Sequence, residues 1–209
     1  MQHNNQLLPE SLATLALRKI ECYANKINHL LLIICLFFLT ENLHATIWDD
    51  AAKKIKQLDP SSFKTLPNNI IKVLEIRGCK IPQVYSFEKP HNVIQGQFAK
   101  KGQNDWAVLC SVNSASTLLV FWGGSTQCSS EIESEENINW LQGIGDGKIG
   151  YSRFISSADK KQMQKYQEYN GESILQPLSH EGIDVAFIGK ASGVRYCYKG
   201  KWKFFSGAD

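Results

Sequence analysis

An uncharged run of ten apolar residues, Leu30–Leu39, limits where a folded domain can begin in this chain. A helix needs roughly 20 apolar residues to cross the hydrocarbon core of a membrane, so the run is too short to be a transmembrane span. Its length is typical of the hydrophobic region of a secretory signal, and Lys26 supplies the positive charge that precedes such a region. We therefore predict a signal peptide, with an uncleaved membrane anchor as the alternative.

A cleavage site is expected just after this run, because Leu43 and Ala45 stand at the −3 and −1 positions before Thr46. Cleavage there gives residues 1–45, a signal peptide with a long leader, and residues 46–209, a single mature domain. A domain of that length can bury a sizeable core. The sequence thus predicts an exported protein, periplasmic or extracellular, with no stable membrane span after processing.

Four cysteines follow the expected cleavage site, at Cys79, Cys110, Cys128 and Cys197. An even number of cysteines in an exported protein predicts disulfides. We predict that Cys79 pairs with Cys110 and Cys128 with Cys197. Four cysteines permit three pairings, and buried free thiols are the alternative. None forms a C-x-x-C pair, which argues against a zinc site.

The spacing of apolar residues predicts helices over residues 48–58, 66–77 and about 157–169. Asp59-Pro60 is expected to end the first helix and Gly78 the second. Ser156 or Ser157 is expected to cap the third, and Gly171 to stop it.

Between and after these helices the pattern changes to short runs of β-branched and aromatic residues, as antiparallel strands require. We expect a charged edge or loop at residues 131–136 and a hairpin around Gly145-Asp146-Gly147. The fold class predicted is α+β, with the N-terminal helices packed on an antiparallel meander sheet and one helix inserted before the last three strands. The strands are expected at residues 93–98, 106–111, 117–122, 140–144, 149–155, 184–188, 194–198 and 202–205.

The charge of the chain argues against a nucleic-acid partner. The formal net charge is +3, and removing residues 1–45 takes away three basic and three acidic side chains, so it does not change. The one tight basic cluster, residues 195–203, alternates with aromatic residues and is typical of the wet side of strands. The glycines of residues 143–147 precede no helical pattern, so they do not form a dinucleotide fingerprint, and we expect no cofactor.

Two segments of the chain resemble each other. Each has a glycine, then an aspartate (Asp105 or Asp184), then alanine two places on, then a second strand. The first copy, extended back to Gly96, resembles the FG-GAP repeat of integrin-type propellers. That resemblance implies a β-hairpin, but Ala99-Lys100-Lys101 stands where the family has its calcium-binding aspartates, so it implies no calcium site.

A wider resemblance covers nearly the whole mature chain. It is to a set of uncharacterised secreted bacterial proteins, which have no established activity. The resemblance implies an exported single domain and supplies no catalytic residue. It is carried by residues 66–67, 74–75, 78–83, 103–111, 182–184, 190–192 and 200–209.

The sequence offers few residues that could carry out catalysis. Only His91 and His180 remain after processing, so a three-histidine metal site is excluded within one chain, and we expect no metal. His180 and Glu181 near Asp184 are candidate acid–base groups, and Asp105 with Asp184 or Glu181 is a candidate carboxylate pair for glycan hydrolysis. The structural interpretation is favoured: His180 and Glu181 are polar turn residues, and each aspartate caps the turn before its strand.

Aromatic residues are plentiful, and those exposed on a sheet face can stack on sugar rings or anchor a protein partner. Trp202 and Tyr198, with Arg195 nearby, are the candidates for binding residues. The leading hypothesis is therefore an exported, non-enzymatic module that binds a protein or a cell-envelope component. The alternatives are an envelope glycan hydrolase with paired carboxylates and a small hydrolase inhibitor.

Overall fold

The computed structural model describes residues 47–127, 129–169 and 177–207. Contacts divide the chain into two units, Met1–Ile47 and Trp48–Asp209, and all but one of the described residues belong to the second. The expected signal peptide, its cleavage site, Cys128 and Gly171 lie outside the described residues. The mixed α+β class is confirmed, but the strands form four antiparallel sheets instead of one meander.

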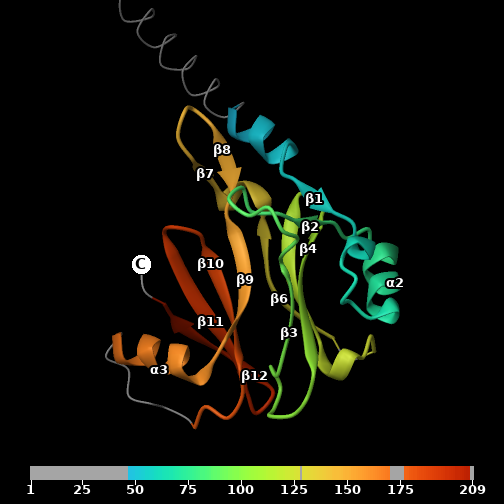
Figure 1. The fold of residues 1–209 in the computed structure, drawn as a ribbon, viewed down its shortest axis with the longest axis vertical. Coiled ribbons are helices and arrows are strands. Elements are labelled where there is room, and N and C mark those ends of the chain that lie inside the picture. Colours follow the sequence, from blue (N-terminus) through green and yellow to red (C-terminus); the bar gives the residue numbers. More distant parts are fainter. Residues whose placement is uncertain (1–46, 128, 170–176, 208–209) are drawn as a thin grey trace, which may run out of the picture. The chain divides into compact units, whose positions relative to one another are not determined.

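Two of these sheets have four strands each (Figure 1). In the first sheet the order is β3 (Val93–Gly96), β4 (Asp105–Val112), β5 (Ala115–Phe121) and β6 (Ser129–Glu136). In the second the order is β12 (Lys201–Ser206), β11 (Ala191–Tyr198), β10 (Gly182–Phe187) and β9 (Arg153–Ala158). Two-stranded sheets join β1 (Gln57–Leu58) to β2 (Ile81–Pro82) and β7 (Leu141–Gly143) to β8 (Ile149–Tyr151).

The two larger sheets pack face to face. Side chains alternate between the faces of a strand, and the inward ones from both sheets, among them Leu109 and Ile183, share one buried cluster. Helix α2 (Asn68–Ile76) covers the outer face of the first sheet, and α3 (Lys160–Tyr169) packs on the outer face of the second. In Figure 1 these helices lie on opposite sides of the sheets, so the layers run α/β/β/α.

Helix α2 confirms the sequence prediction for residues 66–77. Ile70 and Leu74, one turn apart, are fully buried against the sheet. Pro67 stands at the N-cap, where its missing N–H costs nothing, and Gly78 follows the helix at φ 70°, a conformation that glycine adopts without strain.

The first predicted helix is too long. Residues 47–53 are helical, but Gln57 and Leu58 form β1 and pair with Pro82 and Ile81. The N–H of Gln83 also donates to the carbonyl of Lys56 (2.8 Å). These tertiary backbone hydrogen bonds outweigh the weak helical preference of the remaining turn.

The third predicted helix begins later than expected. Ser156 and Ser157 pair with Asp184 and Ile183, so β9 continues through Ala158. Asp159 provides the cap: its Oδ1 accepts a hydrogen bond from the N–H of Gln162 (2.7 Å).

The predicted strand 149–155 divides at Ser152 into β8 and β9, which belong to different sheets. Ser152 is fully buried; its N–H donates to the carbonyl of Trp140 and its carbonyl accepts from Ile188. The charged run 131–136 lies in β6, a sheet edge, as expected. The hairpin around residues 145–147 is confirmed by the pairing of β7 with β8.

Asn92 joins the two large sheets. This residue is fully buried at φ 67°, and its own carbonyl accepts a hydrogen bond from Leu109 of β4 (3.0 Å). Its side-chain amide binds the backbone of β9 on both sides of Phe154: Oδ1 accepts from the N–H of Ile155 (3.0 Å), and Nδ2 donates to the carbonyl of Arg153 (3.1 Å). Nδ2 also donates to the carbonyl of Pro82 (2.7 Å). One side chain therefore replaces a neighbouring strand along the edge of β9.

The predicted Cys79–Cys110 disulfide is confirmed, and it ties the end of α2 to β4. Closing a loop of this length stabilises a fold by about 3–4 kcal/mol. Of the predicted Cys128–Cys197 bridge, Cys128 lies outside the described residues, and Cys197 carries a free, buried thiol, the alternative considered above. Burial raises the pKa of Cys197, and the hydrogen bond that the backbone N–H of Gly200 donates to its sulfur opposes this shift. The number of cysteines in a sequence says nothing about the distances between them, so it could not choose between a bridge and a free thiol at Cys197.

We expect Asn92→Ala to lower the free energy of unfolding by about 3 kcal/mol or more, because three buried backbone groups lose their partner. Urea denaturation measures this change. Asn113→Ala is the matched control: Asn113 also has positive φ (50°) but is exposed, so its loss costs only about 1 kcal/mol of backbone strain. Equal losses in the two variants would contradict the role given to the Asn92 amide.

Candidate functional site

The outer face of the second sheet carries a groove beside α3. Register places Phe154 opposite Ala186 and Ser156 opposite Asp184, and Ala186 opposite Ser192. These five side chains therefore share one face, and it is the face turned away from the first sheet, because Ile183 and Val185 alternate with them and point into the buried cluster between the sheets. All five line a groove of about 470 Å³, together with residues 187–191 at its end.

Asp184 is the most buried polar side chain of this groove, with 7% of its surface exposed. Gln162 of α3 reaches across and donates from Nε2 to Asp184 Oδ2 at 3.4 Å, a long hydrogen bond. The same Gln162 amide lies 3.2 Å from the hydroxyl of Tyr166, which is 3.1 Å from Ser192 Oγ. Asp184 Oδ1 is buried and has no hydrogen-bond partner among the residues that the structure describes.

The environment of Asp184 disfavours its charge. Burial raises the pKa of Asp184, against the opposing effects of the Ser192 hydroxyl, the Gln162 amide and the more distant charge of Arg195. A buried acceptor without a donor costs about 1–3 kcal/mol. Oδ1 has almost no exposed surface, so the fold tolerates this unfavourable acceptor beneath the floor of the groove, out of contact with solvent.

Aromatic side chains form the wall of the groove opposite α3. Phe154 packs against Phe87 (5.0 Å between ring centroids) and His91 (5.8 Å). His91 Nε2 accepts from the N–H of Val84 (2.6 Å), so Nδ1 carries the proton and donates to the carbonyl of Lys89 (2.8 Å). Burial lowers the pKa of His91, which is consistent with this neutral imidazole. The loop before Asn92 is thereby fixed beside Phe154.

Asp105, the first residue of β4, and Glu181, just before β10, both direct their carboxylates to the turn after β3, away from the groove. Asp105 Oδ2 accepts from the N–H groups of Phe98 (2.9 Å) and Ala99 (2.8 Å), and Oδ1 accepts from Gly123 (2.7 Å). Glu181 Oε2 accepts from the N–H of Gln97 (2.7 Å), the residue before Phe98. These carboxylates bind backbone donors, as turn caps do.

The suspected pairing of Asp105 with Asp184 is not seen. Ala107, two residues after Asp105, faces the cluster between the sheets, whereas Ala186, two residues after Asp184, lines the outer groove. The equivalent aspartates of the two similar segments therefore point to different faces, and the second sheet lies between them. His180 stacks on Tyr196 (4.3 Å, 14°) in the loop before β10.

The three predicted binding residues lie elsewhere. Trp202 stacks on Trp122 (5.5 Å, 22°) and packs against the cluster between the sheets. Arg195 forms a two-pronged ion pair with Glu133 of β6, with Nη2 2.7 Å from Oε2. Tyr198 is half-buried against the α3 cluster. These side chains were expected to be exposed for a ligand, but they pack against neighbouring parts of the fold instead.

Sequence reasoning missed Phe154, Ser156, Ser192 and Lys190 as groove residues. The sequence contained one signal for them. In three strands, polar residues alternate with apolar ones, and this alternation predicts that the polar positions face outward. Only the register of β9 with β10 and β11 shows that these positions are neighbours.

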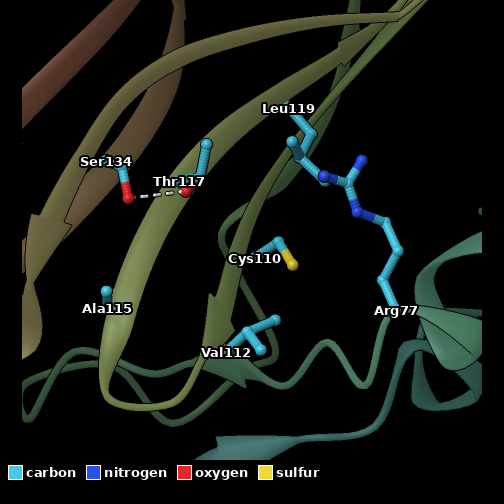
Figure 2. Close-up of a pocket in the computed structure, with 7 residues that line it drawn as sticks. All are labelled: Arg77, Cys110, Val112, Ala115, Thr117, Leu119 and Ser134. Carbon is cyan, nitrogen blue, oxygen red and sulfur yellow. Dashed lines mark hydrogen bonds between the residues drawn. The ribbon is translucent and has the colours of Figure 1, made fainter.

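A second, smaller groove of about 350 Å³ lies on the outer face of the first sheet beside α2 (Figure 2). Figure 2 shows Cys110, Thr117 and Leu119 on its strands and Arg77 at its rim. Its polar groups already have partners: Thr117 Oγ1 donates to Ser134 Oγ (3.0 Å), and Arg77 pairs with Glu131. This groove therefore offers a ligand less than the one at Asp184.

Comparison with known proteins gives no family, curated relative or solved structure that matches this chain. Across residues 47–127, 129–169 and 177–207, no three His, Cys, Asp or Glu side chains gather in a way that could hold a metal ion. Within the same ranges, no helix is long and apolar enough to cross a membrane.

We expect Asp184→Asn to raise the free energy of unfolding at pH 7, because it removes a charge that burial disfavours. The raised pKa means that the folded carboxyl binds its proton more readily than the unfolded one. Its contribution to stability is therefore present in acid, below the unfolded pKa, and is lost as pH rises through the folded pKa. The advantage of the variant should be largest at neutral pH and vanish in acid.

Urea denaturation of both proteins at pH 7 and at about pH 3 measures this difference. Asp146→Asn is the matched control, because Asp146 is an exposed turn residue at φ 51°, a conformation that asparagine accepts. It should change stability at neither pH. A lower stability of Asp184→Asn at pH 7 would show that the fold already satisfies the carboxylate.

Proposed function

We propose that this chain is an exported, non-enzymatic binding module whose ligand site is the groove on the outer face of β9, β10 and β11. The single observation that carries this proposal is the groove itself, about 470 Å³ on the outer face of the second sheet, lined by the aromatic ring of Phe154 and by the polar side chains of Ser156, Asp184 and Ser192. The partner is a protein or a cell-envelope component, not a nucleic acid.

Binding is favoured over catalysis by the placement of the carboxylates. Hydrolysis of a glycan needs two carboxyl groups that flank one bond. Asp105 and Glu181 are held by backbone N–H groups, and Asp184 lies on the other face of the second sheet. The residues lining the groove include a single carboxylate, Asp184.

Export is supported by the apolar run Leu30–Leu39 and by the Cys79–Cys110 disulfide, which is typical of oxidising compartments. Membership in the secreted bacterial family stays a prediction. Intact mass of the product recovered from the periplasm tests export: the account expects a chain that begins near Thr46 and loses one disulfide on reduction. A full-length product held in the membrane would contradict it.

The binding site is tested by blocking each groove with the same substitution. Ala186→Arg fills the groove at Asp184, and Ala115→Arg fills the groove beside α2. We expect sedimentation of the wild type with purified peptidoglycan sacculi or outer-membrane vesicles, at least tenfold weaker sedimentation of Ala186→Arg, and no change for Ala115→Arg. Loss in Ala115→Arg alone would move the site to the other groove. Equal binding by all three proteins would refute a groove site altogether.

A further inference from the structure

We propose that the imidazole of His91 is a pH-sensitive fastening for the surface loop of residues 84–90. The neutral ring joins the two ends of the loop, and protonation of the ring releases the loop from the wall of the groove. The opening of the loop does not depend on a ligand, whereas its effect on binding rests on the proposed function.

The base of this loop is held by groups that do not titrate. Residues 85–90 are all exposed, but Gln83 before them is buried. Its side chain binds both backbone groups of His91: Oε1 accepts from the N–H (3.1 Å), and Nε2 donates to the carbonyl (3.1 Å). The N–H of Tyr85 donates to the carbonyl of Tyr151 in β8 (3.0 Å). The two ends of the loop therefore stay attached to the domain when the loop opens.

The ring of His91 closes the loop above this base. Nε2 accepts from the N–H of Val84 at the start of the loop (2.6 Å), and Nδ1 donates to the carbonyl of Lys89 near its end (2.8 Å). The ring also packs edge to face with Phe87 (5.1 Å between centroids, 78° between planes). One side chain therefore connects both ends of the loop to its exposed phenylalanine.

Few other contacts hold residues 86–90. Apart from the bond to the ring, the hydrogen bond of this segment among the described residues runs from the N–H of Phe87 to the carbonyl of Val84, and it is long (3.4 Å). Phe87 also packs on Phe154 of β9 (5.0 Å between centroids). Loss of the contacts to His91 therefore removes most of what keeps this segment against the domain.

A protonated ring does not fit this arrangement. Cationic imidazole carries a hydrogen on both nitrogens and has no acceptor. Nε2–H and the N–H of Val84 would then point at each other across 2.6 Å. Val84 is buried, so its N–H has no solvent to bind while the ring stays in place. The ring must therefore leave, and the Lys89 carbonyl and Phe87 lose their contact with it.

The charges around His91 favour the neutral ring. Burial lowers the pKa of His91, and the charge of Lys56 adds to this shift against the opposing hydrogen bond to Lys89. Arg153, next to Phe154 on β9, points to the opposite face of that strand. The other titratable side chains of the loop and the groove are Tyr85, Glu88, Lys89, Asp184 and Lys190. None of the carboxylates that the structure describes forms an ion pair with the ring.

The pH dependence of closure has a definite sign. In the open loop the ring titrates near the ordinary histidine pKa of about 6.5, and in the closed loop it titrates below that value. Closure is therefore fully favoured above the open-loop pKa. As pH falls, closure weakens by about tenfold per pH unit until pH reaches the closed-loop pKa.

The segment that opens supports the wall of the groove. Phe154, which lines the groove, packs on Phe87 (5.0 Å) and on His91 (5.8 Å). When both rings move away, Phe154 loses its support. A ligand that binds the groove with its wall in place is therefore held less tightly in acid.

Amide hydrogen exchange followed by NMR tests the fastening in the free protein. The N–H of Val84 is protected while His91 Nε2 accepts it, so its protection factor, corrected for the intrinsic rate at each pH, reports closure of the loop. We expect this factor to fall about tenfold between about pH 7.5 and about pH 5.5. The N–H of Gln83, which donates to the Lys56 carbonyl (2.8 Å), should stay better protected at both pH values, because the base does not open with the loop.

Two variants identify the group that titrates. His91→Gln keeps an acceptor and a donor but does not titrate, so its Val84 protection should not change with pH. His180→Gln is the matched control: His180 stacks on Tyr196 before β10, and its loss should leave the pH response of Val84 as in the wild type. If His91→Gln does not fold, the ring nitrogens of the wild type still test the inference, because the neutral ring should carry its proton on Nδ1.

Four results of these measurements would overturn the fastening. They are a Val84 protection factor that does not change with pH, an equal change in His91→Gln, equal protection of Val84 and Gln83, and a neutral ring protonated on Nε2. Each would show that His91 does not control a local opening of the loop.

Sedimentation with peptidoglycan sacculi or outer-membrane vesicles tests the effect on binding. Binding of the wild type should be weaker at about pH 5.5 than at about pH 7.5, and His91→Gln should lose this difference. A loop that opens without any change in binding would overturn the regulation and keep the fastening. Absence of binding at both pH values would reject the proposed function, and the regulation with it, while the exchange result would stand.

Discussion

The side-chain amide of Asn92 determines how the two large sheets meet. It binds Arg153 and Ile155 of β9 with the geometry of a neighbouring strand, while its own carbonyl pairs with Leu109 of the first sheet. Phe154 lies between the two bound residues and must therefore point outward, away from the buried cluster. The same contacts satisfy the free edge of β9, which would otherwise be open to strand addition. The wall of the groove and its restriction to side-chain recognition both follow from this one buried amide.

The groove exists because α3 covers only part of the second sheet. Met163 packs with Val194, Tyr196 and Phe205 on one side of that face, whereas Asp184 and Ala186 remain beside the helix. Gln162 is the contact from α3 to Asp184: its hydrogen bond to Oδ2 is 3.4 Å long, and Oδ1 has no donor among the described residues.

Local patterns in the sequence predicted local structure well. The α2 stripe, the β10–β12 meander and the Cys79–Cys110 bridge all depend on residues close in the chain or on a simple periodicity. The end of the first helix was wrong because β1 pairs with a strand more than twenty residues away, and no periodicity records that competition. The Cys128–Cys197 pairing rested on a count of cysteines, which gives no distances, and Cys197 is a free, buried thiol.

Only part of the candidate site could be predicted from the sequence. Asp184 was among the candidates, but its expected partner Asp105, the first residue of β4, directs its carboxylate to the turn after β3, because two strands with the same motif can face opposite sides. Trp202 was expected on an exposed face, yet its register opposite Cys197 turns it toward Trp122. Which face a strand residue takes depends on register between distant strands, and one residue of shift reverses it.

Whether the Asp184 carboxyl is charged in the folded protein is measured directly by ¹³C NMR titration of its side-chain carbon. The titration midpoint should lie above the ordinary aspartate value, because burial opposes the charge. A midpoint at or below the ordinary value would contradict the claim that the fold buries this carboxyl without enough donors to stabilise its charge.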